Sequence, residues 1–301
     1  SFAAAGDDPA LSYAAARDGY ELARHLGYRG EGFYLLNNAI ESAIHIGDWD
    51  WAAATLDEAE AAGLMPQDTV PRLRHAQLAG LRGARGAQVD DLLDAIAANL
   101  GDVTEIQAHS VVQEVGGELA LARGEIEEGY RLSIGAFRLN PAPDSAALLR
   151  AGRAAGWLGD LVALREARQL IDGVPGRVPA AWRLEMDAAI AALEGRRAEA
   201  ISLFRDALHG LRELGLDYER AIAAVNSMKM VGPNVAELRD AVDEAEATFR
   251  RLGATPMLAR LAEARAGFPR GSGDSSSAVD GSAGAGGGAD AARIPSVGRG
   301  V

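Results

Sequence analysis

Three polar side chains at intervals of four residues come closest to a metal site in this sequence. Glu105, His109 and Gln113 would share one face of a helix, where a carboxylate and an imidazole can bind a metal ion together. The sequence offers no third strong ligand beside them. We therefore favour a plain helix surface at this position and expect neither a metal nor another cofactor.

Two glycine-rich stretches invite comparison with phosphate-binding loops. Residues 80–86 hold three glycines at intervals of three residues with two arginines between them, and residues 284–288 hold four glycines. A phosphate loop follows a strand and ends in Gly-Lys-Ser or Gly-Lys-Thr, and neither stretch has this setting. We interpret the first as the loose end of a helix in an irregular repeat and the second as part of a low-complexity tail.

The acidic groups have simple structural explanations. Asp90, Asp91 and Asp94 stand at the start of a predicted helix, where negative side chains favour the helix dipole without any ligand. The acidic stretch 240–246 is typical of a solvated helix face, with a cation or a basic partner as the alternative.

Catalytic patterns are missing from the chain. The five histidines lack the His-Glu-x-x-His spacing, and no serine sits in a nucleophile elbow. The absence of cysteine excludes disulfides, thiolate metal sites and cysteine nucleophiles. The sequence thus predicts that this chain is not an enzyme.

Composition favours helices and limits the possible partners. Hydrophobic residues make up 48% of the chain but aromatic residues only 5%, so alanine and leucine supply most of the apolar surface. The net charge of −13 disfavours direct binding to nucleic acid or to an anionic membrane. Because the sequence has neither a membrane-length apolar run nor a signal-peptide pattern, we expect a cytoplasmic location.

Glycines at regular intervals mark the turns of an internal repeat. They lie 39, 38, 35, 36 and 37 residues apart, at Gly47, Gly86, Gly124, Gly159, Gly195 and Gly232. Periods of this length are typical of stacked helical hairpins. The sequence therefore predicts an all-α fold, a right-handed superhelical solenoid of such hairpins over residues 1–268. Residues 269–301 have too little apolar content to form a core and are expected to be a disordered tail.

Small residues at helical spacing predict where the two helices of a hairpin touch. Ala52, Leu56 and Ala59 follow the turn at Gly47, and Ala200, Phe204 and Ala207 follow the turn at Gly195 with nearly the same spacing. Small side chains let two helices approach closely, and the larger ones fill the space beside them.

These turns resemble the tetratricopeptide repeat. The resemblance rests on Gly47-Asp48-Trp49 with Ala52 and Ala59, on Gly195 with Ala200, Phe204 and Ala207, and on Gly124 with Ala136 and 139–141. It covers about residues 10–266, and the repeat near Gly86 departs furthest from the consensus.

A narrower resemblance concerns residues 211–215, 249–254 and 256–261. They look like the C-terminal repeat region of large bacterial signalling proteins, in which an AAA/STAND-type ATPase is joined to an adenylate/guanylate cyclase or a LuxR-type domain. Since this chain has neither a Walker nor a cyclase motif and begins without methionine, the resemblance implies a repeat arm whose catalytic parts lie elsewhere.

The first helix of each hairpin lines the groove of such a solenoid. With the turn glycines in common register, the predicted wall carries polar and aromatic side chains that could bind an extended peptide: Tyr34, Asn37, Glu41, Glu114, Glu118, Arg150, Arg153, Trp182, Glu185, Glu219, Asn226 and Lys229. Alternatively, Tyr34 and Trp182 simply pack against neighbouring helices.

Two functions stay open from the sequence. In the first, the chain is a non-catalytic scaffold that binds a protein, a peptide or the upstream domains of its own parent protein. In the second, it is a sensor or an enzyme domain that takes a small molecule into a pocket between helices.

Overall fold

The computed structural model describes residues 8–62, 70–99, 106–141 and 146–267. In these residues the chain forms α-helices and short 3₁₀ turns without a strand, which confirms the all-α prediction. Both the predicted tail, 269–301, and Glu105 of the predicted metal site lie outside the described residues.

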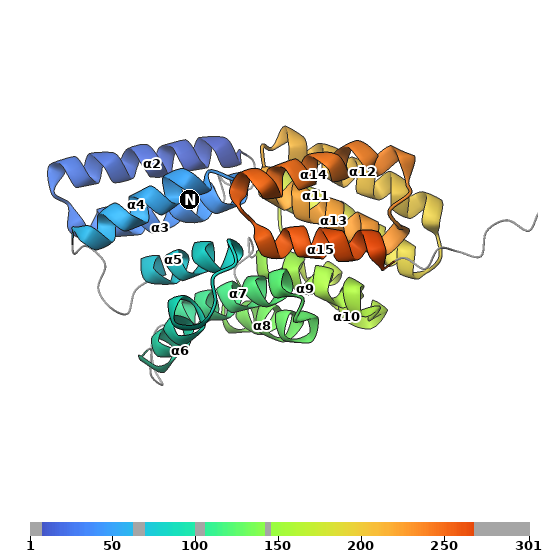
Figure 1. The fold of residues 1–301 in the computed structure, drawn as a ribbon, viewed down its shortest axis with the longest axis horizontal. Helices are drawn as coiled ribbons and strands as arrows, with labels where there is room; N and C mark the ends of the chain where they lie inside the picture. The colour runs from blue at the N-terminus through green and yellow to red at the C-terminus, as the bar shows by residue number, and fades with distance from the viewer. Residues whose placement is uncertain (1–7, 63–69, 100–105, 142–145, 268–301) are drawn as a thin grey trace, which may run out of the picture. The chain divides into compact units, whose positions relative to one another are not determined.

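The helices follow one another with short connections (Figure 1). Their bounds are α2 (Pro9–Leu26), α3 (Arg29–Ile46), α4 (Trp49–Ala61), α5 (Val70–Leu81), α6 (Asp90–Asn99), α7 (Ile106–Arg123), α8 (Ile126–Leu139), α9 (Ala146–Leu158), α10 (Leu161–Leu170), α11 (Arg177–Leu193), α12 (Arg197–Glu213), α13 (Asp217–Val231), α14 (Arg239–Leu252) and α15 (Thr255–Ala266). The 3₁₀ turns span Gly86–Gln88 and Ala236–Leu238.

The helix boundaries follow local sequence signals. All six predicted turn glycines have a positive φ, between 64° and 93°. Such a backbone suits glycine because it has no Cβ. Asp8 and Asp160 accept hydrogen bonds from backbone N–H groups in the first turns of α2 and α10, and so satisfy donors that a helix start leaves free.

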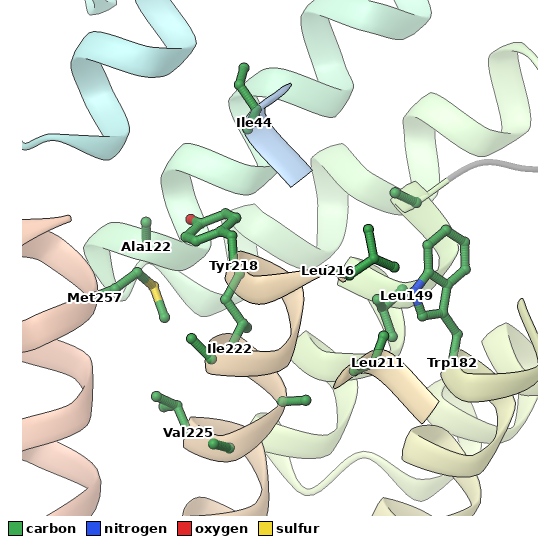
Figure 2. Packing of buried hydrophobic residues seen from close by; sticks show 14 of the residues in the cluster. Ile44, Ala122, Leu149, Trp182, Leu211, Leu216, Tyr218, Ile222, Val225 and Met257 are labelled. Atoms are coloured by element: carbon green, nitrogen blue, oxygen red, sulfur yellow. The ribbon is translucent and has the colours of Figure 1, made fainter. Parts of the chain in front are cut away.

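Consecutive helices pack in pairs, and the predicted contact positions are buried. Ala52, Leu56 and Ala59 of α4 are at most 1% exposed, as are the three corresponding residues of α12. Figure 2 shows Leu211 of α12, Leu149 of α9 and Trp182 of α11 in the same part of the hydrophobic core.

We call the first helices of the pairs the inner helices, and the last of them contacts the first. They are α3, α5, α7, α9, α11 and α13, and they contact one another in chain order. In addition, α13 contacts α3, and α15 contacts α5 and α7. In an open repeat array each repeat contacts only its neighbours in sequence. The contacts of α13 and α15 therefore differ from the open groove that the sequence predicted.

Hydrogen bonds join α14 and α15 to the C-terminal ends of α3 and α5. Arg251 in α14 donates to the carbonyl oxygen of Gly47 at 3.0 Å, and Thr255 in α15 donates to that of Arg82 at 2.9 Å. Both acceptors are carbonyls at the ends of helices, which have no partner within their own helix.

An aromatic cluster lies in the same region of the core. The ring of Tyr218 in α13 is 4.9 Å from that of Trp49 in α4 and 6.3 Å from that of Phe249 in α14, both edge to face. Figure 2 shows Tyr218 directed toward Ala122 of α7, with Met257 of α15 beside them.

Candidate functional site

The inner helices direct charged side chains toward one another and form a buried cluster, which we call the inner network. Its members are Glu41 and His45 of α3, Arg74 and Gln77 of α5, Glu114 and Glu118 of α7, Arg150 and Arg153 of α9, Glu185 of α11, and Glu219 and Asn226 of α13. Every inner helix contributes at least one member. Most of the residues predicted to line the groove belong to it.

One half of the inner network connects α3, α5, α7 and α9. Arg74 pairs with Glu41 at 2.8 Å and donates to Gln77, whose amide in turn donates to Glu118. Arg150 pairs with Glu114 at 2.8 Å and with Glu118 at 3.2 Å. Each guanidinium thus pairs with one or two carboxylates of a neighbouring helix.

The other half is centred on Arg153. Its Nε and Nη2 donate to the two carboxylate oxygens of Glu185 at 2.8 and 2.9 Å, while Nη1 donates to Glu219 at 2.8 Å. The amide of Asn226 donates to Glu185 at 2.9 Å, and His45 Nδ1 lies 3.1 Å from the second oxygen of Glu219. A forked guanidinium–carboxylate pair is among the strongest hydrogen-bonded arrangements in proteins.

Opposite charges dominate the electrostatics of the inner network. Burial alone would lower the pKa of His45, but the hydrogen bond and charge of Glu219 outweigh it and raise the pKa above 6.5. Burial alone would raise the pKa of Glu219, but Arg153 and His45 hold it far below 4.5. Burial would also raise the pKa of Glu114, but the charges of Arg150 and Arg74 outweigh it and lower the pKa of this carboxyl.

These shifts predict a stability optimum in mildly acidic solution. His45 has a higher pKa in the folded chain, so its contribution is complete below pH 6.5 and is lost as the pH rises through the folded value. Glu219 has a lower pKa in the folded chain, so its contribution is complete above pH 4.5 and is lost as the pH falls through the folded value. The pair thus stabilises most between these limits, which urea midpoints measured across the pH range would reveal.

A matched variant isolates the histidine contribution to this pH profile. His45→Asn should remove the loss of stability on the alkaline side, whereas His209→Asn, at a position whose side chain is 70% exposed, should keep it. If both variants retain the same alkaline loss, His45 does not cause it.

The inner network leaves little capacity for chemistry on a ligand. The side chains of Glu118, Arg150, Arg153, Glu185 and Glu219 are at most 5% exposed, and their charges are directed at one another. A cavity of about 20 Å³ lies beside them, where Glu118 Oε1 and the Tyr218 hydroxyl have no hydrogen-bond partner in the described residues. A space of this size holds about one water molecule, not a substrate.

The predicted groove residues fall into three groups. Arg150, Arg153, Glu185 and their partners face inward as the register indicated, but they are buried because α13 closes on α3, so the open wall predicted for them is not present in this structure. Trp182 is buried in the core, as the alternative interpretation had it. Tyr34 is 65% exposed, and Lys229 is half-buried against Trp157. Their role in binding a partner stays a prediction.

Sequence reasoning missed His45, Arg74, Gln77 and Trp157. Arg74 and Gln77 lie in the repeat whose turn at Gly86 departs furthest from the consensus. The alignment of the turn glycines therefore did not assign these two residues to the groove. One signal was present in the sequence of α9. Apart from Arg150 and Arg153 this helix is apolar on every side, and such a helix is buried. Its two arginines therefore required buried partners.

The remaining candidates are a metal site, a phosphate-binding loop and a membrane-spanning helix, and the described residues form none of them. In the described residues no three acidic or histidine side chains are placed to hold a metal ion. Gly83 packs against α15, where an added Cβ would lie 2.3 Å from the Thr255 hydroxyl, which fits a helix end better than a phosphate cradle. No helix in the described ranges has both the length and the hydropathy of a membrane-spanning segment.

Asp90 has a partner within the chain. It pairs with Arg123 at 2.6 Å and accepts the N–H of Gly86 at 2.8 Å, and these contacts lower its pKa although burial opposes the shift. The carboxylate therefore ties the start of α6 to α7 and needs no ligand.

Comparisons with protein-family models, with curated proteins and with solved structures yield no match.

Proposed function

We propose that this chain is a non-catalytic helical-repeat module that binds a protein partner. In this proposal it is the repeat arm of a bacterial cytoplasmic signalling protein of the cyclase or LuxR-type ATPase class, and the partner is another protein, a peptide or an upstream domain of the same polypeptide. The resemblance to tetratricopeptide repeats supports the type of module. The resemblance of residues 211–215 and 249–261 to signalling ATPases supports the parent protein.

The observation that carries the proposal is an apolar face on α2, which we call the α2 face. Leu11, Leu22 and Leu26 are 64%, 59% and 54% exposed, and their spacing of 11 and 4 residues keeps them within about 60° of arc on the helix. Tyr28 and Tyr34, at the start of α3, are also exposed. Leu22 and Leu26 lie one helical turn apart, and exposed apolar side chains that adjoin in this way are typical of surfaces that bind another protein.

The inner network supports the same proposal by a different route. Because its charges are paired within the chain, a partner is expected to bind the outer surface and not the side of the helices that faces inward. The net charge of −13 further favours a partner with a basic face. Association should then slow as salt rises, because salt screens exposed charges over about 8–10 Å.

Capture of partners with variants of the chain as bait tests the proposal. The upstream domains of the parent polypeptide are a separate candidate in the same experiment, which is run at low and at high salt. Leu22→Glu combined with Leu26→Glu should weaken capture of a specific partner by at least about tenfold, which corresponds to 1.4 kcal/mol. Val162→Glu is the control, because this residue of α10 is 79% exposed and lies outside the α2 face.

Two results would count against the proposal. A partner retained equally by both variants does not use the α2 face. If the chain retains no protein but turns over a nucleotide by itself, the non-catalytic scaffold is wrong.

A further inference from the structure

A pocket of about 480 Å³ lies among the C-terminal ends of α9, α11, α13 and α15. Its walls include Trp157 and Leu158, Leu193, Lys229 and Met230, and Glu263. We call it the Lys229 pocket. Its volume is within the range of sites that bind small organic molecules.

Lys229 is the only lysine of the chain, and its ammonium group has no ion pair in the described residues. Its Nζ lies over the Trp157 ring, 4.5 Å from the centroid. Burial lowers the pKa of Lys229, and the neighbouring Arg260 lowers it further, while Glu263 opposes the shift. Burial deprives the charged ammonium of part of its hydration, and a carboxylate bound beside it would stabilise the charged form instead.

The aromatic wall of the pocket is held in place by the inner network. The indole N–H of Trp157 donates to Asn226 at 2.8 Å, and the amide of Asn226 donates to Glu185 at 2.9 Å. Glu185 is in turn fixed by Arg153. Because the indole is positioned before any ligand arrives, binding does not have to pay the entropy of ordering it.

The charges around the pocket favour an anion. Arg260 and Glu263 pair with each other, so the ammonium of Lys229 is the charge that stays unpaired among these three groups. The carbonyl groups at the C-terminal ends of these four helices oppose an anion, but several of them already accept hydrogen bonds within the chain, among them those of Gly156, Ala192 and Val231. The position over the Trp157 ring that suits a cation is already occupied by Lys229.

We propose that the Lys229 pocket binds a small organic carboxylate with an apolar body. The carboxylate pairs with the Lys229 ammonium on the side away from Trp157, and the apolar body lies against Leu193 and Met230. This site is separate from the α2 face, so it goes beyond the proposed protein-binding function, and either can fail without the other.

The single lysine makes a direct test possible. With isotope-labelled lysine, the Cε–Hε group of Lys229 gives one NMR signal. Naphthalene-2-carboxylate should shift this signal saturably and raise the pKa of Lys229. The neutral naphthalene-2-carboxamide and inorganic phosphate should bind at least about tenfold more weakly. The affinity for the carboxylate should fall as the pH rises through the pKa of Lys229.

Variants measured by calorimetry complete the test. Lys229→Met, which keeps an apolar side chain of similar length, should lose the carboxylate. Leu158→Glu keeps Lys229 but adds a negative charge to the pocket wall, and it should also lose binding. Val162→Glu adds the same charge on the neighbouring helix outside the pocket and should bind like the parent chain.

Any of three results would overturn the proposal. One is the absence of a saturable shift with the carboxylate in a parent chain that melts normally. Another is equal binding of the amide or of phosphate, which would remove the need for the charge or for the apolar body. The third is full binding by Leu158→Glu or by Lys229→Met.

Discussion

Arg153→Met is expected to cost about 3–5 kcal/mol of folding free energy, as removal of one partner of a buried ion pair does. Its guanidinium is 2% exposed and neutralises two carboxylates, Glu185 and Glu219, that are equally buried. Methionine fills much of the same space but leaves Glu185 without a counter-charge and Glu219 with His45 alone. A decrease in the urea midpoint with an unchanged slope would measure the loss.

Two controls separate the charge from the change of shape. Combining Arg153→Met with Glu185→Gln and Glu219→Gln should recover most of the lost stability, because no uncompensated charge then stays buried. Arg131→Met removes an arginine that is 65% exposed and pairs with Glu128, and it should have a small effect. A small effect of Arg153→Met alone would mean that the inner network contributes little to stability.

Ala200→Arg is expected to be the most damaging single change on the contact between α11 and α12. Ala200 is fully buried, so a larger side chain must displace its neighbours at a cost of about 1–3 kcal/mol, and the buried charge adds to that cost. Ala52→Arg should act in the same way on α4, since Ala52 is also fully buried. Thermal melting followed by circular dichroism would show both effects.

Ala198→Arg provides the matched control for this prediction. Ala198 lies two residues earlier in α12 but is exposed, so an arginine there should leave the melting temperature close to that of the parent chain. If Ala200→Arg and Ala198→Arg melt alike, Ala200 does not lie in the contact between the helices.

Features that depend on neighbouring residues could be predicted from the sequence. The turn glycines and the buried positions of α4 and α12 follow from helix geometry and from the backbone freedom of glycine. The common register also indicated correctly that Arg150, Glu185 and others face the same side. These features need no knowledge of how one repeat is rotated relative to the next.

The partners of those inward-facing charges could not be predicted in the same way. The rotation between successive repeats accumulates along the chain, and small differences per repeat decide whether α13 meets α3 or passes it. Whether Arg153 faces a peptide or Glu219 depends on this sum. Trp182 and Tyr34 illustrate the same limit, since one is buried and the other exposed although both fit the same register.

The contact between α3 and α13 also affects the order in which the chain can fold during synthesis. His45 and Glu219 are 174 residues apart in sequence, so the ribosome must add all the residues between them before this bond can form. Until then the carboxylates and arginines of the earlier helices are expected to stay hydrated, since the helices that cover them do not yet exist. Contacts of such long sequence separation slow folding. The hairpin that holds His45 is therefore expected to stay incompletely packed until a segment 174 residues further along the chain has been made.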